Sequence, residues 1–189
     1  MGARHGILFK HAEAIEQAAR LDVVIFDKTG TLTVGQPDVV QVVSAPGWDE
    51  IALMDTAAAV EAHSEHPLAQ AILKHAGPVR ERAVDYTNID GQGATGRVSG
   101  RWVHLGNRLL MTAQGVVLDA LDAQAETLKG GGRTVVYVAV DRQLAGVIAI
   151  ADAIRPTSRA AIQELHRRKV RVAMITGDQA TWATATKSL

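Results

Sequence analysis

The sequence predicts a parallel α/β unit into which an α+β unit is inserted. Two short apolar runs, Val23–Phe26 and Val170–Ile175, each end in polar residues, as strands of a parallel sheet do at the edge that binds ligands. Between them, residues 36–150 alternate helical patterns with strand patterns that pair as hairpins, which is typical of an α+β unit. We therefore expect one domain in two parts, 1–35 and 151–189, with a second domain at 36–150.

Composition excludes several classes of protein. The 189 residues are 47% hydrophobic, which suffices for a core, and they contain 20 Lys and Arg against 20 Asp and Glu. This balance gives no overall field that would attract nucleic acid or an acidic membrane surface, so we expect no nucleic-acid partner and no direct membrane contact. The absence of cysteine excludes disulfides and thiolate metal sites. No apolar run in the sequence reaches the roughly 18 residues of a membrane span.

The first part of the α/β unit begins with a helical pattern. Apolar residues recur at helical spacing within 8–21, and Val23–Phe26 then predicts a strand that is buried on both faces. Gly35-Gln36-Pro37 predicts a break in the chain, after which residues 39–43 are expected to form a short linking strand.

Two helices are expected next, at 49–62 and 68–76. The buried positions expected on the first helix are Ile51, Ala52, Ala58 and Val60. Between the helices, Pro67 suits the first turn of the second helix and keeps the preceding His66 out of the α conformation. His66 is therefore predicted to lie in a bend and not on a helix face.

Glycines follow at Gly91-Gln92-Gly93-Ala94-Thr95-Gly96, which matches the dinucleotide fingerprint G-x-G-x-x-G. That fingerprint requires a helix that opens at the glycines, whereas residues 97–105 alternate and turn at Ser99-Gly100 as a β-hairpin does. The dinucleotide interpretation therefore fails. What remains is a glycine turn whose backbone can approach a ligand closely, because no Cβ intervenes.

The remaining elements alternate between helix and hairpin. Two short helical patterns within 109–128 precede a second hairpin, 134–140 with 143–150, which turns at Asp141-Arg142. An amphipathic helix from Arg155-Pro156 to Lys169 then leads to the second apolar strand.

The run Asp27-Lys28-Thr29-Gly30-Thr31 follows the first buried strand. An aspartate in this place often caps a helix or forms a turn, but such a role explains Asp27 alone and not the whole run. The run resembles the phosphorylation signature of the P-type ATPases, cation pumps of the haloacid-dehalogenase superfamily. The resemblance implies that Asp27 is both the nucleophile that takes the γ-phosphate of ATP and a ligand of Mg²⁺. It also implies that the backbone carbonyl of Thr29 is a second Mg²⁺ ligand and that Lys28 and Thr31 line the phosphate site.

The second apolar strand ends in Thr176-Gly177-Asp178, which resembles the second phosphate-site motif of the same family. This tripeptide is common in proteins when it stands alone. Because it follows the other parallel strand, we expect it to lie at the same edge of the sheet as Asp27. The resemblance implies that the Thr176 hydroxyl binds the phosphoryl group and that both strands belong to a partial haloacid-dehalogenase-like phosphorylation domain.

Ser64-Glu65-His66-Pro67-Leu68 is similar, letter for letter, to the nucleotide-domain motif of the heavy-metal pumps in this family. The resemblance implies that the His66 ring packs against the adenine of ATP and that Glu61 contacts the edge of the base. The other nucleotide contacts that it implies are Gly91, Gly93, Gly106 and Asn107. An ordinary turn is the alternative at each glycine, and for Gly106-Asn107 taken alone it is the simpler interpretation.

By this resemblance, the chain is an ATP-binding piece of a heavy-metal pump for Cu⁺, at the cytoplasmic face of a membrane. Its partners are ATP and the rest of the pump, including the transmembrane and actuator domains. The family's phosphorylation domain also carries a catalytic lysine and a G-D-G-x-N-D motif that these 189 residues do not contain. We therefore expect the isolated chain to bind ATP without full catalysis, and its incomplete sheet to allow a dimer through the open edge.

Two alternatives remain open. A soluble haloacid-dehalogenase-type phosphatase usually has an acid/base aspartate two residues after the nucleophile, where this chain has Thr29, and threonine cannot do that work near neutral pH. The other alternative is a non-catalytic nucleotide-binding module. Hydrolysis of a generic phosphate ester would support the phosphatase, whereas ATP binding without turnover would support a module cut from a pump.

Overall fold

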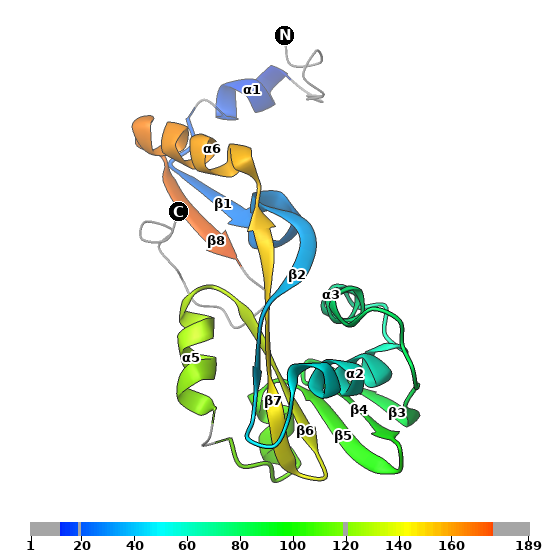
Figure 1. The fold of residues 1–189 in the computed structure, drawn as a ribbon. Helices are drawn as coiled ribbons and strands as arrows, with labels where there is room; N and C mark the ends of the chain where they lie inside the picture. Colours follow the sequence, from blue (N-terminus) through cyan, green and yellow to red (C-terminus); the bar gives the residue numbers. More distant parts are fainter. Residues whose placement is uncertain (1–11, 19, 119–120, 176–189) are drawn as a thin grey trace. The chain divides into compact units, whose positions relative to one another are not determined.

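The chain divides into two compact units in the computed structural model, which describes residues 12–18, 20–118 and 121–175. The α/β unit combines Met1–Gly35 with Ile154–Leu189, and the α+β unit is Gln36–Ala153 (Figure 1). The first contains a parallel strand pair and the second contains antiparallel strands with helices. The predicted combination of fold classes is therefore confirmed. The roles predicted for 1–35, 36–150 and 151–189 as functional domains stay predictions.

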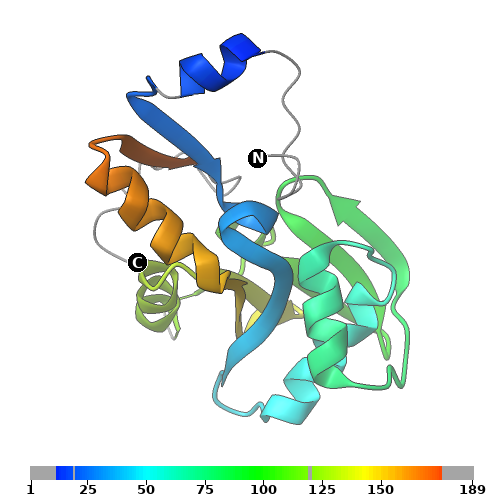
Figure 2. The same cartoon turned by 90° about the horizontal axis from the view of Figure 1, so that it is seen from above.

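Two parallel strands form the α/β unit, β1 (Val23–Asp27) and β8 (Arg171–Ile175), with Asp27 opposite Ile175. A short helix, α1 (Ala12–Ala18), precedes them in the chain. Helix α6 (Pro156–Arg167) runs along one face of the strand pair (Figure 2). Apolar side chains from both layers form a small core, which consists of Leu32, Ile162 and Val172 with Phe26, Leu165 and Met174 around them.

The expectation that β1 is buried on both faces is wrong. Phe26 packs against the core under α6, but Ile25, which points to the other face, is 54% exposed. The reason is that α6 covers one face of a two-stranded sheet, so successive residues of β1 alternate between partial burial and exposure. An apolar run in the sequence does not reveal how many layers will cover it.

The α+β unit contains a six-stranded sheet with the order β2-β7-β6-β5-β4-β3. The strands are β2 (Thr33–Ser44), β3 (Val84–Ile89), β4 (Gly93–Val98), β5 (Arg101–Gly106), β6 (Thr134–Val140) and β7 (Gln143–Ile154). Neighbours from β3 to β7 pair antiparallel, which confirms the hairpins predicted at Ser99-Gly100 and Asp141-Arg142. All four turn residues have positive φ, as tight two-residue hairpins require.

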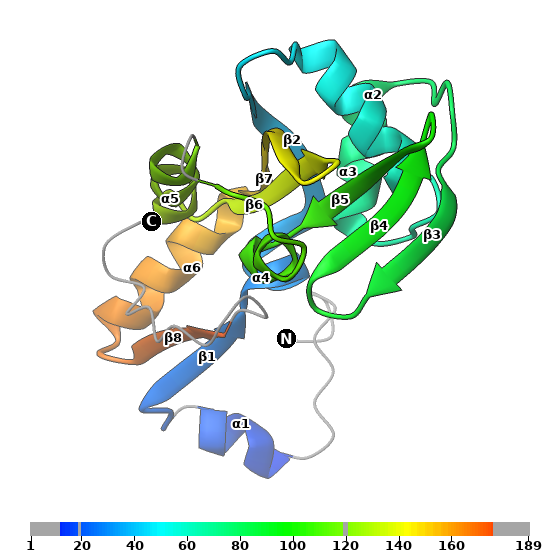
Figure 3. The ribbon, with the colours of Figure 1, turned by 90° about the horizontal axis from the view of Figure 1, so that it is seen from below.

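Helices cover both faces of this sheet. Helices α2 (Glu50–Glu61) and α3 (Pro67–Ala76) pack on one face, and α4 (Arg108–Ala113) and α5 (Asp122–Gly130) pack on the other (Figure 3). Strand β6 serves both cores, because alternate side chains of a strand point to opposite faces.

Two local expectations in this unit are wrong. Strand β2 continues through Gly35-Gln36-Pro37, where a break was expected. Pro37 is tolerated because β2 is an edge strand, on which a missing N–H need not remove a ladder hydrogen bond. Ile51 is 68% exposed although Ala58, on the same side of α2, is buried as expected. Ile51 therefore lies on a side of the first turn that the sheet does not cover, whereas Leu53 in the same turn is fully buried.

Strands β4 and β5 approach each other closely at a pair of glycines. Gly93 lies opposite Gly106 in their register. A Cβ on Gly93 would lie 2.1 Å from the carbonyl oxygen of Leu105, and a Cβ on Gly106 would lie 2.1 Å from that of Gln92. The packing of these two strands therefore requires glycine at both positions, independently of any ligand.

Gly93→Ala should destabilise the chain by roughly 2 to 3 kcal/mol, because the new methyl group forces the two strands apart and strains a residue at positive φ. Urea unfolding of the chain measures this change. Gly130→Ala is the matched control, since its Cβ meets nothing within 4 Å, and it should be neutral or stabilising by up to about 1 kcal/mol. Equal stability of the two variants would contradict the close approach.

Candidate functional site

Asp27 is the last residue of β1 and is exposed to solvent. A π-helical turn, Lys28–Leu32, follows it directly. Within this turn Gly30 has a φ of +75°, and its N–H donates a hydrogen bond to the Thr33 hydroxyl over 3.1 Å. The residue expected to be the nucleophile therefore occupies the carboxyl edge of the parallel strands, where α/β proteins bind ligands.

The other residues predicted for the phosphate site are described in part. Thr31 is exposed in the same turn as Gly30. For Lys28 and Thr29 the structure describes the backbone and not the side chains. The predictions at Thr176-Gly177-Asp178 lie outside the described residues, which end at Ile175. The roles assigned to these residues stay predictions.

Arg155 holds the turn after Asp27 in shape, although the sequence indicated only a helix start there. Its Nε donates to the Thr33 carbonyl over 2.8 Å and its Nη2 to the Gly30 carbonyl over 3.0 Å. The Arg155 N–H and the Ser158 hydroxyl both donate to the Leu32 carbonyl, over 2.9 and 2.8 Å. Donors at the start of α6 thus fix backbone carbonyl groups in the turn and at the beginning of β2. The planar guanidinium suits this task because its donors have fixed geometry.

A magnesium ion fits the chemistry at this edge. Mg²⁺ is usually bound by one or two carboxylates together with phosphate oxygens and water. Asp27 supplies a carboxylate at the strand end, and the adjacent turn supplies backbone carbonyls. Within the described ranges, no three His, Cys, Asp or Glu side chains come together as a metal cluster.

Four of the residues predicted to bind nucleotide lie together at one end of β4 and β5. The Asn107 N–H donates to the Gln92 carbonyl and its Nδ2 to the Gly91 carbonyl, each over 2.8 Å. Asn107 Oδ1 also accepts from the Leu110 N–H over 3.2 Å and so caps α4. Gly93 and Gly106 are paired across the two strands. Only Gly91 faces open space, so it alone matches the expectation of a free backbone approach.

Glu61, at the end of α2, is a buried carboxyl group. Glu61 is only 8% exposed, and this burial raises its pKa to about 7. A hydrogen bond from Ser64 acts in the other direction and lowers the pKa. Burial and the charge of Glu61 raise the pKa of Tyr86, which also hydrogen-bonds to Ser64. Ser64 thus links the carboxyl group to a tyrosine on β3 that no sequence motif had marked.

His66 is the N-cap of α3 and is exposed, which confirms its predicted position in a bend. Its Nδ1 accepts from the Leu68 N–H over 3.2 Å, and its own N–H donates to the Ser64 hydroxyl over 3.2 Å. Ser64 therefore connects Glu61 with His66. Among the described residues no hydrogen bond joins this pair to Asn107. Nearby, His63 stacks on Tyr86 with ring centroids 5.0 Å apart.

Adenine fits the chemistry of the Glu61 and His66 pair. With a pKa of about 7, the Glu61 carboxyl group is protonated in part of the molecules at neutral pH. In that form it can donate one hydrogen bond and accept another, which suits the edge of a purine base. The cap bond fixes the orientation of the His66 ring and leaves the ring exposed for stacking.

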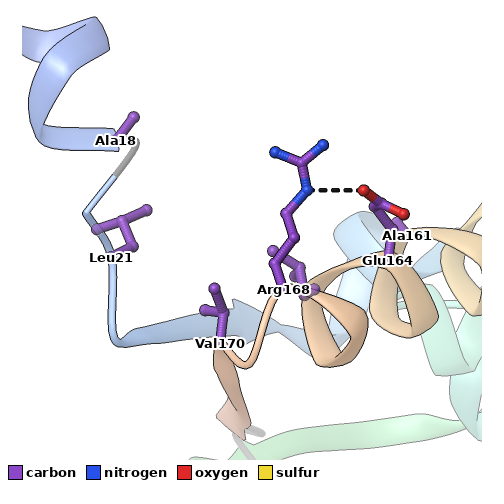
Figure 4. A pocket seen from close by; sticks show the side chains of 7 residues that line it. Ala18, Leu21, Ala161, Glu164, Arg168 and Val170 are labelled. Atoms are coloured by element: carbon purple, nitrogen blue, oxygen red, sulfur yellow. Dashed lines mark hydrogen bonds and ion pairs between the residues drawn. The ribbon is translucent and has the colours of Figure 1, made fainter.

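A different hollow in the α/β unit, of about 430 Å³, lies between α1 and α6 (Figure 4). It is lined by Ala18, Leu21, Ala161, Glu164, Leu165, Arg168 and Val170. The Arg168 Nε donates to the Glu164 carboxylate over 2.7 Å, so the two charged groups neutralise each other. Leu21 and Val170 precede the two strands, which places the hollow at the opposite end of β1 from Asp27. It is therefore not the phosphate site.

Comparisons with known proteins agree with this geometry. The family model of haloacid dehalogenase-like hydrolases matches residues 21–188. The chain is 41% identical over 187 residues to a silver exporting P-type ATPase of Salmonella typhimurium, covering 97% of this chain and 23% of that protein. A crystal structure of a zinc-transporting PIB-type ATPase in the E2.Pi state matches with a TM-score of 0.72 and 36% identity, over 97% of this chain and 30% of that one.

A smaller solved structure is also similar to this chain. The crystal structure of the N-domain of HMA6, a copper-transporting P-type ATPase, is 30% identical, with a TM-score of 0.50. The match covers 61% of this chain and 99% of that one.

The chain belongs to the haloacid dehalogenase-like hydrolase family. Within that family it is similar to the catalytic regions of the metal-transporting P-type ATPases, and its relatives include copper and silver pumps. The chain spans less than a quarter of the length of these first two relatives, 23% and 22%. Within the residues that the structure describes, no helix is both long and apolar enough to cross a membrane.

The raised pKa of Glu61 makes folding stability depend on pH. Between pH 4.5 and about 7 the folded chain holds a proton on Glu61 that the unfolded chain has released, so this group's contribution to stability falls as the pH rises. The free energy of unfolding of Glu61→Gln, relative to that of wild type, should therefore rise by up to roughly 3 kcal/mol between pH 4.5 and pH 8. Urea unfolding at the two pH values measures the difference.

Glu65→Gln, at an exposed carboxyl group in the same bend, is the control for this experiment. The difference in free energy of unfolding between Glu65→Gln and wild type should be the same at both pH values. If the difference between Glu61→Gln and wild type were also the same at both pH values, the pKa of Glu61 would not be raised by burial.

Arg155→Lys should loosen the turn after Asp27, because lysine keeps the charge and loses the fork that donates to three backbone carbonyls. We expect faster hydrogen exchange at the amides of residues 30–34 and a loss of about 1 to 3 kcal/mol in stability. Arg159→Lys, an exposed site on the same helix, should change neither. Unchanged exchange in Arg155→Lys would show that the turn keeps its shape without the arginine.

Proposed function

We propose that this chain is the ATP-binding and phosphate-accepting region of a heavy-metal P-type ATPase, in which ATP phosphorylates Asp27. The observation that carries the proposal is the position of Asp27-Lys28-Thr29-Gly30-Thr31 as a structured turn at the carboxyl end of a parallel strand. The similarity to metal-transporting P-type ATPases over 97% of the chain supports it.

In this proposal the α+β unit binds ATP. Glu61 contacts the edge of the adenine through its protonated carboxyl group, which donates and accepts one hydrogen bond each. His66 stacks on the base, with its ring held by the bond from the Leu68 N–H. Gly91 and Asn107 offer backbone and amide groups to the rest of the nucleotide from the start of α4. The glycine pair Gly93 and Gly106 acts indirectly, because it sets the spacing of β4 and β5.

The Asp27 carboxylate then attacks the γ-phosphorus of ATP, the bond to the β-phosphate oxygen breaks, and ADP leaves. The Arg155 contacts keep the turn in the shape that presents Asp27 and the backbone of Thr29. Asp27 and the Thr29 carbonyl would hold Mg²⁺, which would supply charge neutralisation between the carboxylate and the phosphates. Lys28, Thr31 and Thr176 complete the phosphate site in this proposal.

The transported ion in the proposal is Cu⁺, and the chain acts at the cytoplasmic face of the membrane with the transmembrane and actuator domains as partners. The relatives support a heavy metal in general, since they are named for silver, copper and zinc. In this proposal the isolated chain binds ATP without completing the reaction. Self-association would use the open edges of the strand pair β1 and β8.

A calorimetric titration with ATP tests the nucleotide site. His66→Ala should weaken ATP binding by roughly ten- to a hundredfold, because stacking on a base contributes about 1 to 3 kcal/mol. His75→Ala, an exposed histidine on the same helix, should bind like wild type. Asp27→Asn should also keep its ATP affinity and should lose phosphorylation in the full-length pump.

Two outcomes would count against the proposal. Unchanged ATP affinity in His66→Ala would show that the adenine does not bind at the start of α3. A folded wild-type chain that does not bind ATP would leave the sequence similarity without the predicted activity.

A further inference from the structure

A second hollow, of about 470 Å³, lies in the α+β unit on the β4 and β5 strands. It is lined by Thr95, Trp102, His104, Gln114, Asp141 and Arg142, and we call it the His104 hollow. None of the residues predicted to bind nucleotide is among them. Its volume lies within the roughly 300 to 1,000 Å³ that is typical of sites for small molecules.

His104 lines this hollow and carries a buried hydrogen-bonding atom that no described residue uses. The residue is only 7% exposed, and within the described part of the chain its Nδ1 has no hydrogen-bond partner. A buried polar atom without a partner carries a desolvation cost, which a ligand could relieve. Burial, and then the charge of Arg142, lower the pKa of His104, whereas Asp141 raises it, so the ring is neutral at physiological pH.

The neighbours of His104 combine an aromatic surface with a second buried polar group. Trp102 lies on the same face of β5, two residues before His104, and is 44% exposed. Thr95 is the register partner of His104 on β4 and is also buried. The Arg97 guanidinium lies over the Trp102 ring, 5.7 Å from its centroid. The hollow thus offers an indole and a nearby cation beside two buried polar residues, which suits a planar molecule with polar atoms.

The charge at the hollow favours an anion. The Asp141 carboxylate is already engaged, because it accepts from the Arg101 Nε over 2.9 Å and from the Trp102 N–H over 3.0 Å. Arg142 follows it in the hairpin turn, is exposed, and forms no ion pair among the residues that the structure describes. A guanidinium without a partner at the rim of the hollow is a ready site for a carboxylate or phosphate.

We propose that the His104 hollow binds a small planar organic anion, with its ring against Trp102, its anionic group on Arg142 and a polar atom at His104 Nδ1. The site is separate from the proposed ATP site, so a ligand here would act on the α+β unit without competing for Glu61 or His66. The size of the hollow and the burial of His104 favour a small molecule over an acidic protein segment.

Three probes of the same shape and different charge test the proposal: benzoate, benzamide and benzamidine. Each is titrated into the whole chain at pH 7.5, with backbone amide shifts and the ¹⁵N shifts of the histidine rings as readouts. Benzoate should shift the amides of Trp102, His104, Gln114 and Arg142 and the Nδ1 signal of His104. It should bind about tenfold more tightly than benzamide, as expected for one charge-assisted hydrogen bond. Benzamidine should not bind.

Arg142→Gln should reduce the affinity for benzoate about tenfold, to that of benzamide. The matched control is Arg82→Gln, which removes the same charge at another exposed arginine and should leave the affinity within twofold. The amide spectra of both variants show directly whether they are folded.

Several results would overturn the proposal. One is equal affinity for all three probes, which would remove the role of charge. Another is an absence of shifts at the hollow with millimolar probe, and a third is shifts confined to Gly91 and Asn107. Binding of an oligoglutamate peptide at these residues without binding of benzoate would instead assign the surface to a protein partner.

Discussion

The architecture of the α+β unit depends on two central strands that are apolar on both faces. In β6 and β7, Val135–Val140 and Ala145–Ile150 are buried without a break, so the sheet needs helices on each side to exclude water. The chain supplies α2 and α3 for one face and α4 and α5 for the other. Beside β6, strands β5 and β4 carry the exposed Trp102 and the buried polar Thr95, and the surfaces that we propose to be functional lie there.

Much of this arrangement could be predicted from the sequence, because period and turn chemistry are local properties. The hairpins at Ser99-Gly100 and Asp141-Arg142 followed from alternation and turn residues, and both occur. Burial was predicted less well, since it depends on layers contributed by distant segments. Ile25 is exposed because one helix covers the strand pair, and no pattern within β1 contains that information.

The candidate site shows the same division between local and distant information. Motifs marked Asp27, Glu61, His66 and Asn107, whose positions at strand or helix ends follow from neighbouring residues. They could not mark the residues that hold these groups in place. Arg155 contacts Gly30 across 125 positions of sequence, and Tyr86 on β3 reaches Ser64 in the segment between α2 and α3. Such supporting residues have no fixed spacing from the groups that they hold, so only the folded chain reveals them.

The α+β unit begins and ends on neighbouring strands of one sheet. Strand β2 carries the chain in, β7 carries it out, and the Gln36 N–H donates to the Asp152 carboxylate over 3.2 Å where the two cross the boundary. Hydrogen bonds therefore hold together the two ends of the unit, where the chain enters and leaves it. A unit with such ends can be acquired, lost or exchanged during evolution by changing a single loop of the host domain.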